Sequence, residues 1–187
     1  MVKDINIGFG TSDPVGLSNV GGKLFFTANS GNSTGHELWT SDGTAAGTQL
    51  VKDVYPGSTS SLIANITNVQ GTAFFAANDG THGAELWQSD GTAAGTFLVQ
   101  DIRLGPDSSS VQQLKSVQGK LYFMASDGFH GSELWIASLG TPGDYDASGV
   151  VDGSDFLAWQ RGFGGVATPA GSGADGDGSG AIDAGDL

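Results

Sequence analysis

The chain has 187 residues, of which 32 are glycine and none is cysteine, and its formal net charge is −13. Abundant glycine favours short strands joined by tight turns over a helical bundle, because glycine adopts positive φ without steric cost. The lack of cysteine excludes disulfides and thiolate metal sites, and no apolar run is long enough to span a membrane. The scarcity of Lys and Arg argues against a nucleic-acid partner.

The first three quarters of the chain repeat with a period of 48 residues. The tripeptide Glu-Leu-Trp begins at Glu37, Glu85 and Glu133, and an aromatic pair precedes each copy. The first two copies continue into Ser-Asp-Gly-Thr-Ala-Ala-Gly-Thr, and residues 50–54 and 98–102 then match one another. Residues 2–5 repeat this last element once more, so the chain starts in a late part of a unit.

Each unit reads as a small antiparallel sheet. In the first unit, β-prone segments cover residues 23–28, 37–41 and 48–54, and Asp42-Gly43 between the last two is a hairpin signal. A weaker strand fits residues 62–69. Four short strands in 48 residues are the size of one propeller blade. We therefore predict a mainly β, propeller-like array over residues 1–138, with an open β-solenoid as the alternative.

The units resemble the ELWxxDGT repeats of bacterial secreted and surface proteins, since residues 37–44 and 85–92 match that pattern letter by letter. The resemblance implies propeller-like β arrays outside the cell. In the third copy Glu133-Leu134-Trp135 runs into Ile136-Ala137-Ser138, and the Asp-Gly-Thr turn is lost, so the array is expected to end there.

The number of units raises a closure problem. The two chain ends could share one blade, which gives three units, whereas propellers need about four to eight. We expect either that this is the C-terminal piece of a longer protein or that several chains combine. Residues 1–5 lack the apolar core of a signal peptide. Together with the repeats, this suggests that the true N-terminus is missing.

Acidic and imidazole side chains recur in every unit. All three Glu of the chain lie in the motif, and His36, His82 and His130 precede them. A catalytic group is needed once, whereas a structural group is needed in each unit. We therefore expect each Glu to accept hydrogen bonds from turn amides and each Trp to pack between blades. Ligand binding at the ring centre or rim is the alternative, and catalysis is the least favoured.

Three Asp-Gly pairs are expected to form turns rather than ligand sites. They begin at Asp79, Asp90 and Asp127. Aspartate favours turns because its carboxylate accepts hydrogen bonds from backbone amides two residues on. A calcium role for Asp79 and Asp127 is the weaker alternative.

After a short linker at residues 139–143, the composition becomes acidic. Twelve-residue segments that begin at Asp144 and Asp175 agree at positions 1, 3, 5, 6, 9 and 12, where an EF-hand loop presents its ligands and its glycine. We predict two Ca²⁺ sites. The expected ligands, with Val150 and Ala181 contributing carbonyl oxygens, are Asp144, Asp146, Ser148, Val150, Asp152, Asp155, Asp175, Asp177, Ser179, Ala181, Asp183 and Asp186.

Residues 144–187 resemble a dockerin type I domain, because Asp replaces Glu at position 12 and no helix precedes the first loop. The resemblance implies a helix at residues 155–161 and a cohesin-like partner. Loop positions 10 and 11, Gly153-Ser154 and Ala184-Gly185, depart from the usual Ser/Thr pair. The second helix of a dockerin is expected to be missing, since Leu187 follows the second loop directly.

These patterns predict a non-catalytic protein, located outside the cell or on its surface. Its β-repeat array would be anchored through a calcium-binding, dockerin-like tail to a cohesin-like or cell-surface protein. Two alternatives stay open. The chain is a fragment of a polysaccharide-degrading, glycoside hydrolase-associated protein whose catalytic part is missing, or it is a glycan-binding adhesin.

Overall fold

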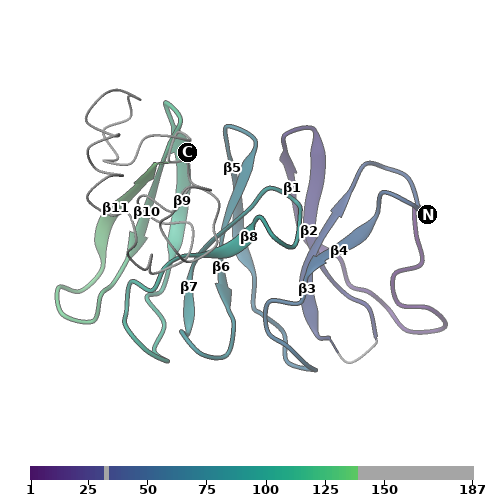
Figure 1. Ribbon diagram of the computed structural model, residues 1–187, viewed down its shortest axis with the longest axis horizontal. Helices are drawn as coiled ribbons and strands as arrows, with labels where there is room; N and C mark the ends of the chain where they lie inside the picture. The colour runs from purple at the N-terminus through teal and green to yellow at the C-terminus, as the bar shows by residue number, and fades with distance from the viewer. Residues whose placement is uncertain (32–33, 139–187) are drawn as a thin grey trace, which may run out of the picture. The chain divides into compact units, whose positions relative to one another are not determined.

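The computed structural model describes residues 1–31 and 34–138. The predicted linker at 139–143 and the paired loops at 144–187 lie outside the described residues. Strands in three antiparallel sheets account for the regular structure of the described part, and no helix occurs there (Figure 1). The prediction of a mainly β fold is confirmed.

The first two sheets have four strands and the third has three. The first sheet has the order β1-β2-β3-β4, with β1 (Val15–Val20), β2 (Lys23–Asn29), β3 (His36–Ser41) and β4 (Gln49–Lys52). The second has the order β5-β6-β7-β8, with β5 (Ala64–Val69), β6 (Thr72–Asn78), β7 (Ala84–Ser89) and β8 (Thr96–Gln100). The third has the order β11-β10-β9, with β9 (Gln112–Val117), β10 (Lys120–Ala125) and β11 (Glu133–Ser138).

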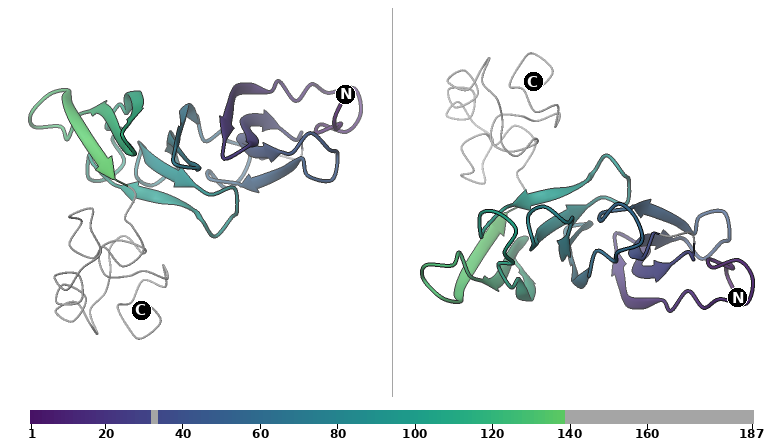
Figure 2. Two further views of the ribbon diagram at one scale, coloured as in Figure 1. Left: turned by 90° about the horizontal axis from the view of Figure 1, so that it is seen from above. Right: turned by 90° about the horizontal axis from the view of Figure 1, so that it is seen from below.

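The three sheets follow one another in chain order (Figure 2). Their first strands lie next to each other, because β1 contacts β5 and β5 contacts β9. The described residues form no closed ring of sheets (Figures 1 and 2). The predicted sharing of one blade by the two chain ends is therefore not observed in this part of the chain.

Three predicted strands differ from the structure, and the one predicted over residues 62–69 begins only at Ala64. Residues 2–5 form no strand, although their sequence repeats that of a strand-forming segment. β4 ends at Lys52, whereas the sequence predicted a strand to residue 54. The reason for the early end of β4 is a side chain, since the Val54 amide donates to Glu37 instead of continuing the sheet.

Packing between successive sheets buries both faces of the central strands of the second sheet. We call the face of a sheet that meets the next sheet its forward face, and the opposite face its back face. The forward face of the first sheet, with Phe25 and Leu38, packs against Phe75 and Trp87 of the second sheet. On the back face of the first sheet, Trp39 packs in a separate cluster. The prediction that the tryptophans pack between sheets is confirmed for Trp87.

The connection that leaves each four-stranded sheet passes close to a glycine. A Cβ on Gly35 would lie 2.7 Å from the Thr59 carbonyl carbon, and a Cβ on Gly83 would lie 2.6 Å from the Asp107 carbonyl carbon. Both glycines also have positive φ, 65° and 70°. No other residue fits these two positions without moving the connection, because only glycine lacks a Cβ.

Replacing Trp87 with alanine should lower the free energy of unfolding by about 3–5 kcal/mol, because a large buried side chain leaves a cavity between two sheets. Urea unfolding followed by circular dichroism measures the change. Phe129→Ala is the matched control, since Phe129 is exposed and its loss should cost no more than about 0.5 kcal/mol. Equal destabilisation by both variants would contradict this account of the core.

Candidate functional site

Two repeated glutamates are fully buried and bind the chain where it leaves each sheet. Glu37 accepts hydrogen bonds from the backbone amides of Val54 at 2.8 Å and Ser61 at 2.9 Å, one on each carboxyl oxygen. Glu85 makes the same pair of bonds, with the amides of Ile102 at 3.0 Å and Ser109 at 2.8 Å. The prediction that these glutamates accept hydrogen bonds from turn amides is confirmed.

The surroundings of Glu37 also determine its protonation. Burial raises the pKa of Glu37 to about 7, against the opposing effect of the bonds from Ser61 and Val54. The pKa of Glu85 is raised for the same reason. A pKa near 7 is typical of general acids and bases, but each carboxyl oxygen here already accepts a hydrogen bond from a backbone amide. The geometry is that of a structural clamp.

Glu133 does not follow the other two. It is exposed, and no amide in the described part of the chain donates to its carboxylate. The expected turn-amide role is therefore not observed for Glu133 among the described residues. The physical reason is local, because the described residues include no outer strand or exit connection next to β11 that could supply the donors.

The predicted Asp-Gly turns are present. Asp90 Oδ1 accepts a hydrogen bond from the Thr92 amide at 2.8 Å. Asp79 and Asp127 each accept bonds from two amides within their turns. These bonds confirm the interpretation of the three aspartates as turn residues.

The sequence did not indicate a pairing between two of these turns and the histidines. His82 Nδ1 lies 2.7 Å from Asp79 Oδ2, and His130 Nδ1 lies 2.7 Å from Asp127 Oδ2. The bond with His130 lowers the pKa of Asp127 and raises that of His130. His36 stands two positions further along its unit, which hid the pairing. A spacing of Asp-Gly-x-His in the second and third units was the available signal.

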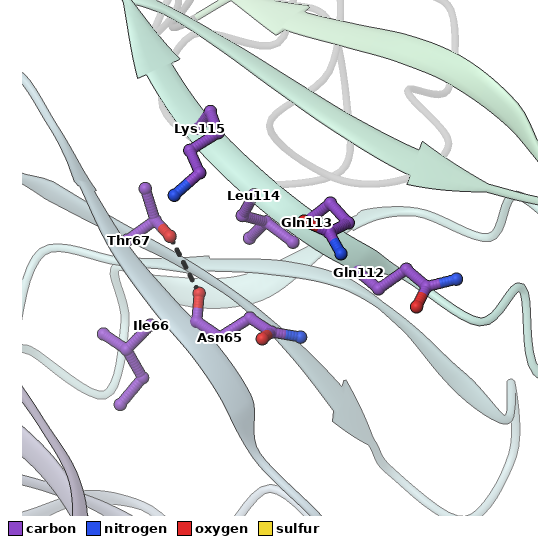
Figure 3. Close-up of a pocket in the computed structure, with 7 residues that line it drawn as sticks. All are labelled: Asn65, Ile66, Thr67, Gln112, Gln113, Leu114 and Lys115. Atoms are coloured by element: carbon purple, nitrogen blue, oxygen red, sulfur yellow. Dashed lines mark hydrogen bonds between the residues drawn. The ribbon is translucent and has the colours of Figure 1, made fainter.

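A polar groove between β5 and β9 is the candidate ligand site of the repeat region (Figure 3). Its volume is about 370 Å³. Exposed amide and ammonium side chains line it together with two apolar ones; the residues are Asn65, Ile66, Thr67, Gln112, Gln113, Leu114 and Lys115. Motif analysis did not find these residues, because most of them differ from their counterparts in the other units.

Irregular backbone shapes the groove. Asn65 and Gln113 adopt left-handed φ of 61° and 59°, and the strand register shifts at both places. Gly16 stands at the equivalent position of the first sheet with φ 68°. A bulge re-aims side chains and bends the strand, and non-glycine residues at positive φ concentrate at functional sites.

The main prediction of metal binding falls beyond residue 138, and a calcium role for Asp79 and Asp127 was the weaker alternative within the repeats. The twelve expected calcium ligands, Asp144 to Asp186, lie outside the described residues. Within the described part, no three His, Asp or Glu side chains are placed to hold a metal ion. No helix in that part is long and apolar enough to cross a membrane. Comparison with family models, curated proteins and solved structures gave no match to this chain.

The buried carboxyl should make stability depend on pH. The pKa of Glu37 is raised, so its neutral form favours folding; this contribution is complete below about pH 4.5 and is lost as the pH rises through about 7. In Glu37→Gln the group cannot ionise. The free energy of unfolding, measured with urea from pH 4.5 to 8, should therefore fall less steeply with pH for this variant than for the wild type.

The matched control is Asp107→Asn, which changes an exposed acid of the repeat region that pairs with Arg103. Its pH profile should follow the wild type. Parallel profiles for the wild type and Glu37→Gln would show that Glu37 does not titrate in this range.

Proposed function

We propose that this protein is a non-catalytic, extracellular β-repeat array that is anchored through a calcium-binding, dockerin-like tail. The array is of the ELWxxDGT type, with the propeller-like arrangement that the repeat pattern implies. The observation that carries the non-catalytic part is the double amide bonding of Glu37 and Glu85. The repeated carboxylates, which are the most conspicuous candidates for acid/base chemistry, are used to build the array.

The anchoring part rests on the two in-register acidic loops. Calcium takes six to eight oxygen ligands, and carboxylates two residues apart in sequence can surround it. Binding would fold the tail, since a site that forms only in the folded state stabilises that state. A cohesin-like or other cell-surface protein is the proposed partner. Hydrolysis of a plant or algal polysaccharide by this chain would favour the alternative of an enzyme-associated fragment.

Calorimetric titration of the full chain with Ca²⁺ should show two sites. Asp146→Ala and Asp177→Ala should each remove one of them, because each deletes a carboxylate ligand of one loop. Circular dichroism should record a gain of helix, from residues 155–161, as calcium binds. Asp107→Ala is the control, since Asp107 is an exposed aspartate of the repeat region that pairs with Arg103. Absence of binding, or two sites left intact in both loop variants, would contradict the proposal.

The groove between β5 and β9 supports a second candidate function, which is glycan binding. Amide side chains such as Asn65, Gln112 and Gln113 both donate and accept hydrogen bonds, which suits sugar hydroxyl groups. The Thr67 hydroxyl donates to the Asn65 carbonyl oxygen at 2.9 Å, so the backbone of the bulge is fixed locally (Figure 3).

A glycan array probed with the labelled full chain tests this candidate. Gln112→Ala should reduce any specific signal about tenfold or more, because a bonded amide contributes about 1.4 kcal/mol or more to a polar site. Lys120→Ala is the control, since Lys120 is exposed in the same sheet but does not line the groove. Equal signals for both variants would remove the groove from consideration.

A further inference from the structure

The third sheet leaves one edge and one face uncovered among the described residues. β11 is its outer strand, at the place that β3 and β7 occupy in the other two sheets, and those strands pair onward with β4 and β8. On the forward face, Leu134 is 73% exposed, whereas its counterpart Leu86 is 1% exposed. Val117 and Ile136 on the same face are exposed as well. This sheet therefore leaves exposed, in the part of the chain that the structure describes, the surface that the other two sheets bury.

Among residues 1–31 and 34–138, no amide takes the place of the two donors at Glu133 on the same edge. In the first two sheets, the corresponding glutamates bind the amides of Val54 with Ser61, and of Ile102 with Ser109. The missing donors would come from an outer strand and the connection after it. A segment that completes the third sheet must supply a strand next to β11 and two amides seven residues apart.

Residues 1–12 have the sequence and the contacts of such a segment. Lys3 Nζ donates to the Thr48 carbonyl oxygen at 2.6 Å, as Lys52 Nζ donates to that of Thr96 at 2.6 Å. Further along, the Asn29 amide donates to the Ser12 carbonyl oxygen at 2.9 Å. This bond matches the one between the Asn78 amide and the Ser61 carbonyl oxygen in the next sheet, at 2.8 Å.

Residues 1–12 therefore lie on the back face of the first sheet as the end of a preceding unit would. Ile5 packs against Phe26 and Trp39 there. Yet residues 2–5 form no strand, because no strand of the β3 type lies beside them in the described part of the chain. The segment has its contacts to the following sheet and lacks those to a preceding one.

The rest of this back face is also open. Leu17 of β1 is 63% exposed, whereas Leu114, its counterpart in β9, is 5% exposed against the second sheet. An apolar surface thus remains on each end of the array, one matching the forward half and one matching the back half of the interface between successive sheets. The two halves are complementary, because that interface already forms twice within the chain.

We propose that two copies of this chain associate head to tail, so that residues 1–12 of one copy complete the third sheet of the other. Residues 2–5 then pair with β11 as the fourth strand, and Glu133 accepts hydrogen bonds from the amides of Ile5 and Ser12. Two copies joined at both ends bring the six sheets of their described residues into one ring, which lies within the four to eight blades of known propellers. Closure of one chain on itself would give only three.

Light scattering of the full chain at 0.15 M salt tests the association. The wild type should have twice the chain mass of 18.9 kDa at high protein concentration. Leu134→Lys should be monomeric, because it places a charge in the apolar interface. Leu104→Lys, which changes another exposed leucine outside the two faces, should remain a dimer. A wild type that is monomeric at every concentration, or dimers that survive Leu134→Lys, would overturn the proposal.

Disulfide trapping tests the register, and the chain has no cysteine of its own to interfere. β3 pairs Leu38 with Lys52 of β4, so Leu134 should lie opposite Lys3 of the other copy. Oxidising a mixture of Lys3→Cys and Leu134→Cys chains should give the mixed disulfide in excess over either symmetric one. Lys3→Cys mixed with Leu104→Cys should show no such excess. An excess in the control mixture, or an intramolecular disulfide in a chain carrying both substitutions, would overturn the head-to-tail pairing.

Discussion

The architecture depends on a buried carboxyl group that holds the chain at the point where it leaves one sheet for the next. Burying Glu37 without partners would cost several kcal/mol, and so would burying the amides of Val54 and Ser61. Because the two amides donate to the Glu37 carboxyl group, all three buried groups have hydrogen-bond partners. Since the Ser61 carbonyl oxygen then accepts from the Asn78 amide of the next sheet, the same clamp fixes the step between sheets.

Each buried glutamate bonds its own sheet to the chain segment that leaves it, and that segment is bonded to the following sheet. The stability of one sheet therefore depends on its neighbour. Lys52 of the first sheet makes two further contacts with the second. Its ammonium group donates a hydrogen bond to the Thr96 carbonyl oxygen and lies 5.9 Å from the centre of the Trp87 ring. An array built in this way gains its energy from interfaces between units as well as from the units themselves. Among the described residues the third sheet has no sheet beyond it, so Leu134 is exposed and no described amide bonds Glu133.

The sequence predicted those features that repeat as identical letters. Short motifs that recur in the units predicted the period, the central strands, the bonding of two glutamates to amides and the Asp-Gly turns. Features that depend on neighbouring sheets were missed. Residues 2–5 have the sequence of a strand, but no described strand lies beside them. The bulges use Gly16, Asn65 and Gln113, which are three different residue types. The β5–β9 groove was missed because two adjacent bulged strands line it.

In the proposed function, the two parts of the chain neutralise their acidic groups by different means. Within the sheets, buried carboxyl groups accept hydrogen bonds from backbone amides and need no cation. The stability of the sheets therefore depends on pH, because the pKa values of these carboxyl groups are raised. Residues 141–187 hold eight Asp and one Arg, and crowded carboxylates of that kind repel one another until a divalent cation binds. Display by the array and attachment by the tail would then be controlled separately, the first by packing and protonation and the second by calcium.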